Sequence, residues 1–469
     1  MLIHRTTNMR PFKSLLAHTQ GLCSPFKCLA ARLVTHTQGL CSPLKCLLTL
    51  KQGLCSPATN QQSDEVRTLL QVFVDTHFIS PGESNVGLFG RGLSCSYGPL
   101  GMELRRNVLH EWWSSVTGSR AQVFGINTPS STCGHLDKTH LDKTHLAKTH
   151  LDKTHLDMTP CDHMQSKEHL MHILRNNLLH GALEQFVPSF ELVNRNLPFG
   201  LAETGRCFHS SKDDGSAEVT LASLVWFCSP RTSSQWLDHW AGQRLKWWRK
   251  FALAPSDFSS SDVPQEELEG PASRGVKIFY KFPWGQEPLE VLWSRGDGEL
   301  MDAHTGVRSK LLSPNRRKSI PHVVSITGRV ERGLLAFLCN SLHLHKREDA
   351  RQRKMLKLHP LLAPIKVALG IGRGATMELR QVCEGLLQEL KEAKMSVWPG
   401  HLEATSTPLE QLHCKYDEMG VLFSAVISDK TLESGLLQVR SRDTAIKETM
   451  HISHLKNFLC RYISAADNM

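Results

Sequence analysis

The stretch LPFGLAETGRCFHSSKDDGS, residues 197–216, is an apolar run that ends in a short charged loop from Lys212 to Gly215. A second apolar run, TLASLVWF at 220–227, returns from that loop. Two apolar runs joined by a short polar turn that contains glycine predict an antiparallel hairpin. Hairpin loops of this shape often hold a charged substrate, so the residues near its tip are the first candidates for a functional site.

Three segments outside the hairpin have the periodicity of amphipathic helices. Residues 97–116 place Leu104, Val108 and Trp112 on one stripe, and residues 168–187 form a second such segment. Tryptophan at helical spacing indicates packing against a core. The third segment, 234–253, carries aromatic residues along one side (Trp236, Trp240, Trp247, Phe251) and basic residues around its other faces (Arg244, Lys246, Arg249, Lys250).

The remaining segments complete a prediction of the fold class. Residues 256–275 are rich in Ser, Pro and Gly and are predicted as a polar surface loop, whereas 277–304 has a strand-turn-strand rhythm. From about residue 357 strands alternate with helices, which predicts a separate unit with a largely parallel sheet. These patterns predict the class α/β (α+β), with strand pairs and helices in the first part of the chain and a separate α/β unit at its C-terminal end.

Composition and charge narrow the function classes. The chain has 469 residues, enough for two or three domains, and no apolar run approaches the ~18–20 residues that a membrane span needs. The formal charge is +10, but residues 1–63 contain seven basic residues and no acid, which leaves 10 − 7 = +3 for the rest. Any binding of nucleic acid by the body must therefore come from local basic patches.

The first 63 residues have the composition of a mitochondrial transit peptide. They lack acids and are rich in Ser, Thr and Leu punctuated by Arg and Lys. A duplicated segment, HTQGLCSPFKCL at 18–29 and HTQGLCSPLKCL at 36–47, lies within them. The 14 cysteines are scattered, and without a secretory signal they favour reduced thiols over a disulfide framework.

A second repeat, HLDKTHLDKTHLAKTHLDKTHLDMT at 135–159, has period five. Its histidines would spiral around a helix by about 140° per step and would alternate between the faces of a strand. No regular structure brings them together, so the repeat is predicted as a low-complexity linker and not as a metal site.

The glycine turn GIGRGATMEL at 370–379 follows a predicted strand and opens a predicted helix. Its pattern is G-x-G-x-G-A, which departs from the dinucleotide-binding fingerprint G-x-G-x-x-G at the third glycine. The unit is also too short for a full doubly wound fold, so we expect no cofactor.

Several segments occur in the order found in class II aminoacyl-tRNA synthetases of the glycyl type. YGPLGMELRRNVLHEWW resembles their first signature, LPFGLAETGRCFHSS the second, and SITGRVERGLLAFL a worn third signature with Arg332 at the arginine's place. The stretch from LKLHPLLAPIKVAL through LQVRSRDT resembles their C-terminal anticodon-binding domain. The resemblance covers roughly residues 90–465. It implies a class II synthetase-like antiparallel sheet domain followed by an anticodon-binding-like mixed α/β domain.

The second signature lacks the residues that activation requires. Class II synthetases clamp the ATP α-phosphate with the arginine of an F-R-x-E motif, because a fixed planar donor stabilises the transition state. Here that motif reads Phe208-His209-Ser210-Ser211, so His209 replaces the arginine and Ser211 the glutamate. We therefore interpret His209, Ser211 and Arg332 as degenerate positions of a synthetase-like scaffold that is not an enzyme.

Strings such as NLLHGALE, PRTSSQWLD, KLHPLLAPIKVAL and MHISHLKNFL more closely resemble the family of accessory subunits of mitochondrial DNA polymerase gamma. That resemblance implies a non-catalytic processivity factor in the mitochondrial matrix and nucleoid. Its implied partners are the catalytic polymerase subunit, double-stranded or primer-template DNA, and a second copy in a homodimer, with no membrane. The repeat occupies much of the interval where the family has a helical insertion, which leaves less helix for a dimer contact.

The resemblance and the local charge give two sets of candidate residues. For each set a structural role, in a solvated charged face or in finishing the sheet, is the alternative reading. The candidates for DNA binding are Arg308, Lys310, Arg316, Arg317, Lys318, Arg351, Arg353 and Lys354. The candidates for binding the catalytic subunit are Leu432, Gly435, Leu436, Arg440 and Arg442.

The expected domain limits follow from these segments. They are a transit peptide with repeats (1–63), a synthetase-like domain (64–127 and 173–340), a repeat insertion (128–172), a linker (341–356) and an anticodon-binding-like domain (357–469). Two other functions stay open at this point: a diverged mitochondrial glycyl-tRNA synthetase and a tRNA-binding relic.

Overall fold

The structure is a computed structural model. It describes residues 57–118, 122–131, 174–211, 215–314, 318–346, 352–372, 376–402 and 407–467. Residues 1–56 with the duplicated segment, the period-five repeat and residues 373–375 of the glycine turn lie outside the described residues. Residues 57–63, expected as the end of the transit peptide, are described and begin a helix, α1 (Pro57–Asp75). All the described residues belong to one unit, Ser56–Met469.

The predicted hairpin supplies the second and third strands of a seven-stranded sheet with the order β1-β2-β3-β7-β6-β5-β4. β2 and β3 are antiparallel from Phe199 opposite Phe227 to Ser211 opposite Gly215, as the two apolar runs joined by a short polar turn predict. Among the described strand pairings of this sheet, only β1–β2 is parallel. The strands are β1 (Val123–Gly125), β2 (Phe199–Ser211), β3 (Gly215–Cys228), β4 (Phe258–Asp262), β5 (Arg274–Phe282), β6 (Gly285–Gly296) and β7 (His322–Arg329).

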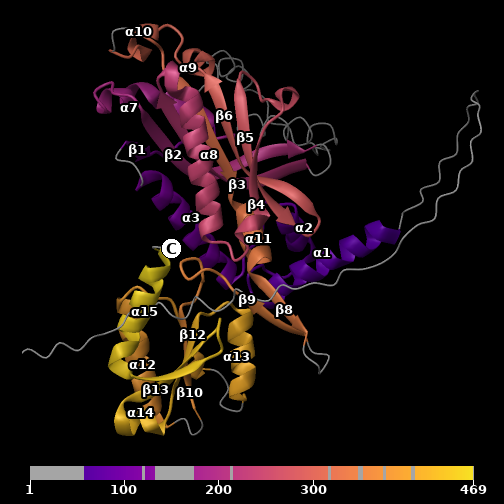
Figure 1. Cartoon of the computed structure of the whole chain (residues 1–469), viewed down its shortest axis with the longest axis vertical. Helices are drawn as coiled ribbons and strands as arrows, with labels where there is room; N and C mark the ends of the chain where they lie inside the picture. The colour runs from indigo at the N-terminus through magenta and orange to yellow at the C-terminus, as the bar shows by residue number, and fades with distance from the viewer. Residues whose placement is uncertain are drawn as a thin grey trace, which may run out of the picture. The chain divides into compact units, whose positions relative to one another are not determined.

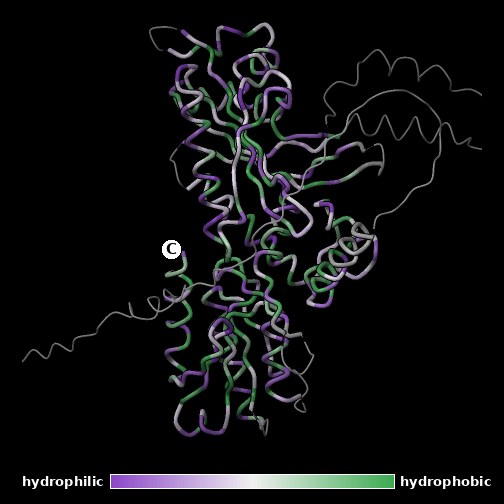
Figure 2. The backbone as a smooth tube through the Cα atoms, turned by 45° about the vertical axis from the view of Figure 1, so that its right-hand side comes forward, coloured by the Kyte–Doolittle hydropathy of each residue, from purple (hydrophilic) through white to green (hydrophobic). Residues whose placement is uncertain are grey.

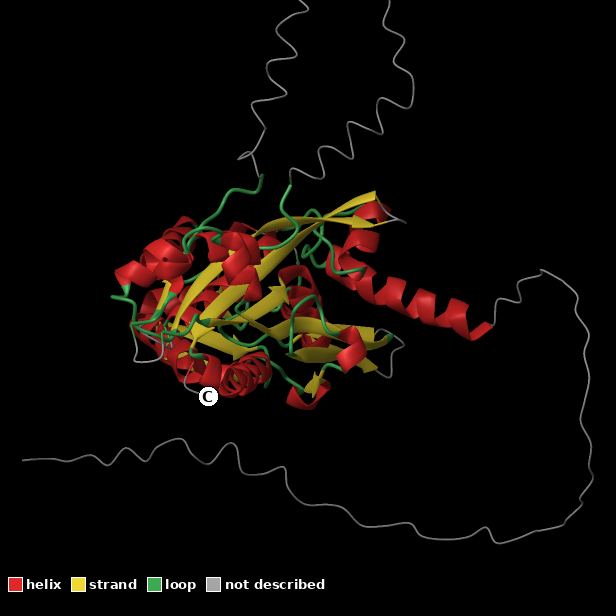
Figure 3. Ribbon diagram, turned by 90° about the horizontal axis from the view of Figure 1, so that it is seen from above, coloured by secondary structure: helices red, strands yellow, loops and turns green. Residues whose placement is uncertain are grey.

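Helices pack on both faces of this sheet (Figures 1 and 3). The predicted stripe of Leu104, Val108 and Trp112 is buried, and so are Trp240 and Trp247. Hydrophobic and hydrophilic residues alternate along the helices, as expected for amphipathic helices (Figure 2). The helices are α1 (Pro57–Asp75), α2 (Glu83–Gly90), α3 (Pro99–Thr117), α6 (Leu179–Glu184), α7 (Phe186–Leu192), α8 (Ser233–Lys250), α9 (Gly298–Ala303), α10 (Arg308–Leu311) and α11 (Val330–Ser341).

The C-terminal part has a second sheet with the order β11-β10-β12-β13-β14. The expectation of a largely parallel sheet is only half right, because β13 pairs antiparallel with both β12 and β14. Between the two sheets, β8 and β9 form a two-stranded hairpin in the segment expected as a linker. The elements are β8 (Leu342–Lys346), β9 (Gln352–Leu356), β10 (Val367–Ile371), α12 (Met377–Glu392), β11 (Val397–Trp398), α13 (Leu409–Glu418), β12 (Phe423–Ile427), α14 (Asp429–Ser434), β13 (Leu436–Ser441), β14 (Lys447–His451) and α15 (Ile452–Asp467).

The helix predicted over 168–187 is confirmed from Leu179 on, where α6 and α7 lie, but is wrong for residues 174–178. Leu174 forms an isolated antiparallel bridge with Ser131, and helix begins only at Leu179. Asn177 Oδ1 accepts a hydrogen bond from the backbone N–H of Leu179, at 3.0 Å, at the start of α6. Leu174 and Arg175 are not helical because their backbones pair with Ser130, Ser131 and Phe208 instead.

Two further predictions need correction. The surface loop expected over 256–275 contains β4, which pairs with β5 and buries Phe258 against Trp248 and Tyr280. Arg244, expected on an outer face of its helix, is 1% exposed. Its Nε donates to Glu290 Oε1 at 2.9 Å, and a buried carboxylate of this kind needs such a partner.

No described helix has the length and apolar content needed to cross a membrane.

Candidate functional site

The hairpin places His209 two residues before the end of β2, opposite Ala217. The His209 ring is half-buried, and its Nε2 has no hydrogen-bond partner. Burial, and then the nearby Arg329 guanidinium, lower the pKa of His209 below its ordinary value. A neutral imidazole at this position cannot supply the fixed positive charge of a phosphate-clamping arginine. Ser211 is the last residue of β2.

Arg332 lies in the first turn of α11 and is held by groups of the protein itself. Its Nη2 donates to the backbone oxygen of Arg91 at 2.6 Å, and its Nη1 forms an ion pair with Glu287. The side chain is largely buried, and this burial lowers its pKa. Gly92 makes room for it, because a Cβ there would lie 2.4 Å from Arg332 Nε. The positive charge of Arg332 is therefore already compensated by Glu287.

The predicted DNA-binding residues fall into two places. Arg308 and Lys310 are exposed on the short helix α10, and Lys318 is exposed with a φ of 40°. Among the described residues none of these three has a carboxylate partner within ion-pair distance. Arg316, Arg317 and Arg351 lie outside the described residues, and Arg353 lies in β9 opposite His345.

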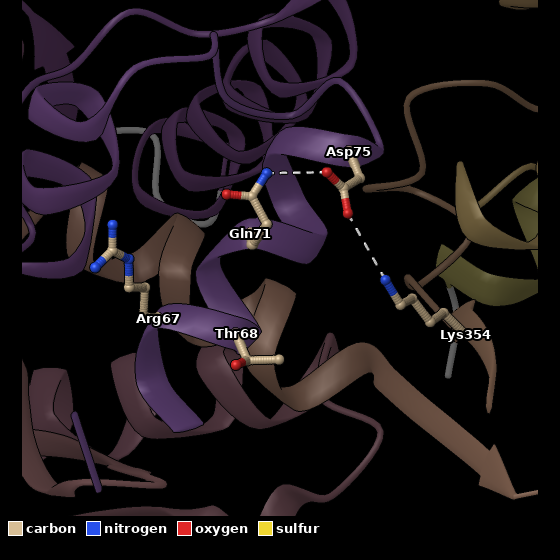
Figure 4. A pocket seen from close by; sticks show the side chains of 5 residues that line it. All are labelled: Arg67, Thr68, Gln71, Asp75 and Lys354. Carbon is tan, nitrogen blue, oxygen red and sulfur yellow. Dashed lines mark hydrogen bonds and ion pairs between the residues drawn. The ribbon is translucent and has the colours of Figure 1, made fainter. Parts of the chain in front are cut away.

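Lys354 lines a cavity of about 360 Å³ between α1 and β9 (Figure 4). Its Nζ lies 3.7 Å from Asp75 Oδ2, and Asp75 Oδ1 accepts a hydrogen bond from Gln71 Nε2 at 2.9 Å. Arg67 and Thr68 complete the lining. Asp75 partly compensates the charge of Lys354, so this residue is a weaker candidate for phosphate contact than the three cations near α10.

The candidates for binding the catalytic subunit separate into exposed and buried residues. Leu432 on α14 and Leu436 on β13 are 44% and 42% exposed. Gly435 lies between them with a φ of 69°, the left-handed conformation that ends α14. A side chain there would also meet the His451 ring, because a Cβ would lie 2.3 Å from Nε2.

Arg440 and Arg442, in contrast, are buried and bonded inside the C-terminal domain. Arg440 forms a bidentate pair with Asp417 at 2.8 and 2.9 Å. Arg442 donates to the backbone oxygens of Gly420 and Leu358. These contacts account for both arginines as internal supports and give no reason to expect that either touches a partner directly.

The sequence interpretation missed a buried charged pair at the hairpin. Glu203 lies in β2 and forms a buried ion pair with Arg175 at 2.8 Å. The available signal was an acid inside the apolar run FGLAETG, on the same side of the strand as His209. Its partner could not be read from the sequence, because Arg175 fell within a predicted helix. Among the described residues no cluster of three or more His, Cys, Asp or Glu side chains could hold a metal ion.

Comparisons with known proteins agree with this architecture. The family described as "Anticodon binding domain" matches residues 365–461. DNA polymerase subunit gamma-2 of Mus musculus is 46% identical over 84% of this chain and 89% of the mouse protein. DNA polymerase subunit gamma-2, mitochondrial, of Xenopus laevis is 44% identical over 89% of this chain and 91% of the frog protein. Glycine–tRNA ligase of Thermus thermophilus is 27% identical over 61% of this chain and 62% of the ligase.

The similarity to glycine–tRNA ligase and the anticodon-binding match fit the synthetase-like fold class that the three signatures predicted. The level and coverage of identity to the mouse and frog proteins are sufficient to assign a family. This chain belongs to the DNA polymerase subunit gamma-2 family.

Proposed function

We propose that this protein is a non-catalytic accessory subunit of mitochondrial DNA polymerase gamma, which binds the catalytic subunit and DNA and raises the processivity of mitochondrial DNA replication. The observation that carries the proposal is 44–46% identity, over most of the chain, to proteins named DNA polymerase subunit gamma-2. The word mitochondrial in the name of the frog relative supports a mitochondrial location. We place the protein in the matrix, at the nucleoid.

The chemistry of the hairpin supports a role without catalysis. A neutral histidine stands where a class II synthetase needs its clamping arginine, and burial lowers its pKa further. Arg332 is bound to Glu287 and to the backbone of Arg91. A site that activates an amino acid with ATP needs charges held ready for the phosphates. We infer that the polymerase chemistry belongs to the partner subunit.

For DNA we propose contacts from the α10 surface, defined as Arg308, Lys310 and Lys318, together with the neighbouring Arg316 and Arg317. The three described cations are exposed and none has a described carboxylate partner. Cations of this kind bind phosphates without reading bases, so the affinity should fall steeply with salt concentration. Arg351, Arg353 and Lys354 form a second, weaker proposed contact.

For the catalytic subunit we propose contact through the α14–β13 corner, defined as Leu432, Gly435 and Leu436. Two leucines more than 40% exposed on either side of a tight glycine turn present apolar surface that a partner can bury. Arg440 and Arg442 are bonded inside the same domain, Arg440 to Asp417 and Arg442 to the backbone oxygen of Leu358. A homodimer is proposed from the family resemblance, and the domain limits given above remain proposals.

The test is primer extension on a singly primed template by the catalytic subunit, with and without this protein. We expect longer products per binding event when the protein is present. Unchanged product length, with binding of the two proteins verified in the same buffer, would contradict the proposal.

Similarity to glycine–tRNA ligase favours a second candidate, a diverged synthetase or tRNA-binding relic. Glycine-dependent exchange of pyrophosphate into ATP distinguishes an active synthetase, and we expect none. Competition between tRNA and duplex DNA at equal salt distinguishes the relic, which would prefer tRNA.

A further inference from the structure

Strand β2 carries a carboxylate inside the protein. Glu203 is 3% exposed at its side chain and projects to the same side of the strand as Gly205 and His209. An ionised carboxylate removed from water must be compensated by a cation and by hydrogen bonds. The Thr128 backbone N–H donates to Glu203 Oε1 at 2.9 Å, and the Thr128 hydroxyl lies 2.9 Å from both carboxylate oxygens.

The compensating cation is Arg175, whose side chain is 10% exposed. Its Nη1 lies 2.8 Å from Glu203 Oε1, 2.8 Å from the Thr128 backbone oxygen and 2.9 Å from Thr128 Oγ1. Its Nε donates to the backbone oxygen of Arg206 at 2.9 Å. A planar fork of donors is therefore matched by acceptors from two segments, an arrangement that an ammonium group cannot satisfy in the same way.

Two glycines make the space for these side chains. A Cβ at Gly205 would lie 2.0 Å from Arg175 Nη2, and a Cβ at Gly181 would lie 2.6 Å from Thr128 Oγ1. Neither glycine has a positive φ, so the close approach, and not the backbone conformation, excludes a side chain there. The backbone beneath the guanidinium is thus shaped to receive it.

The backbone of Arg175 also bonds to both neighbouring segments. Its N–H donates to the Ser130 oxygen at 3.0 Å, and its carbonyl accepts from the Phe208 N–H at 2.9 Å. The adjacent residue Leu174 pairs with Ser131. These bonds satisfy part of the edge of β2 beyond the three residues that pair with β1.

We propose that the synthetase-like hairpin carries a guanidinium-binding site, formed by Glu203, Thr128 and Gly205, and that the occupant of this site is the chain's own Arg175. The ligand class follows from the chemistry of the contacts: a planar cation with several N–H donors faces a buried carboxylate, a carbonyl and a hydroxyl. Removal of the arginine side chain leaves a buried carboxylate and a cavity of guanidinium shape. This site does not depend on the proposed role in replication.

The first experiment is chemical rescue of the full-length protein. We expect Arg175→Ala to lower Tm by about 5 °C or more, because it strands a buried carboxylate. Guanidinium chloride at low millimolar concentration, far below denaturing levels, should raise the Tm of this variant by mass action, whereas equal sodium chloride or urea should not. Two controls should show no rise in Tm with guanidinium. They are the wild type and Arg206→Ala, which changes an arginine that lies on β2 like Glu203 but is 69% exposed.

The second experiment is a double-mutant cycle with Gly205→Ala. Alone, this change pushes against the Arg175 guanidinium and should lower Tm, but in the Arg175→Ala background the added methyl group meets no guanidinium and should cost little. If Arg175→Ala does not accumulate as folded protein, the variants Arg175→Gln and Glu203→Gln and their double variant replace it. We then expect the double variant to lose less Tm than the sum of the two single losses. Additive losses, or equal responses to guanidinium and sodium, would overturn the proposal.

Discussion

Two regions of this molecule carry basic residues in very different surroundings. Inside the C-terminal domain, Arg440 meets Asp417 through two hydrogen bonds and is almost inaccessible to water. On the α10 surface, Arg308, Lys310 and Lys318 face solvent without a described carboxylate partner. A compensated buried charge supports the fold, whereas an uncompensated exposed charge is free to attract a phosphate. The residue type alone therefore does not distinguish support from binding; the partner and the burial do.

The strongest way to break this comparison is to remove one half of the buried pair. We expect Arg440→Ala to lower the free energy of unfolding by about 3–5 kcal/mol, because Asp417, 1% exposed, is left without its cation. Urea denaturation followed by circular dichroism measures the change. Arg461→Ala, at an exposed position of α15, is the control and should change stability by about 0.5 kcal/mol or less. A loss below about 1 kcal/mol for Arg440→Ala would show that the pair is not a main support.

The opposite result is expected at the α10 surface. The triple variant Arg308→Ala, Lys310→Ala, Lys318→Ala should weaken DNA binding about 100-fold near 0.15 M salt and reduce the salt slope by about 3, with little loss of stability. Fluorescence anisotropy with duplex DNA at several salt concentrations measures both. A matched control neutralises three other exposed lysines, Lys246, Lys391 and Lys394. An equal effect in the control would assign the binding to overall charge instead of to this surface.

The sequence predicted features that depend on neighbours along the chain. The apolar stripe of Leu104, Val108 and Trp112 predicted a buried helix, and the two apolar runs of the hairpin predicted its pairing. Arg244 was misplaced because its partner, Glu290, is 46 residues away and on another element. β4 was missed because FSSSD has a single apolar residue, and only its pairing with β5 makes it a strand.

The candidate site follows the same division. The prediction that His209 stands where the F-R-x-E motif has its clamping arginine comes from the sequence alone. That Arg332 is bound to Glu287, or that Arg440 and Arg442 are buried while Leu432 and Leu436 are not, depends on tertiary packing. Residues close together in one segment can therefore be either exposed or buried, and candidates taken from that segment include both surface residues and internal supports.

A smaller effect is expected at the α14–β13 corner. Leu432→Ala should weaken the complex with the catalytic subunit by about 1–2 kcal/mol, because an apolar contact is lost, while stability of the isolated protein stays within about 0.5 kcal/mol. Titration calorimetry of the two subunits measures the affinity. Leu402→Ala, at a leucine 71% exposed, is the matched control. Equal affinities for wild type and Leu432→Ala would remove this residue from the interface.

The smallest effect concerns pH. Burial raises the pKa of Glu331, whose Oε2 accepts from the Thr220 backbone N–H and whose Oε1 has no partner. A carboxyl whose pKa is higher in the folded state stabilises that state at low pH, and the contribution is lost as the pH rises through the folded pKa. Glu331→Gln should therefore gain stability relative to the wild type as the pH rises above the ordinary glutamate pKa of about 4.3. Parallel pH profiles in thermal unfolding would contradict this expectation.

The bridge between Ser131 and Leu174 has a consequence for how this part of the fold comes apart. Arg175 follows Leu174 directly, and its backbone N–H donates to the Ser130 oxygen. The pairing that joins the two segments therefore also holds the guanidinium against Glu203. Separating the segments would withdraw this cation from a buried carboxylate, so an electrostatic penalty adds to the loss of the backbone bonds.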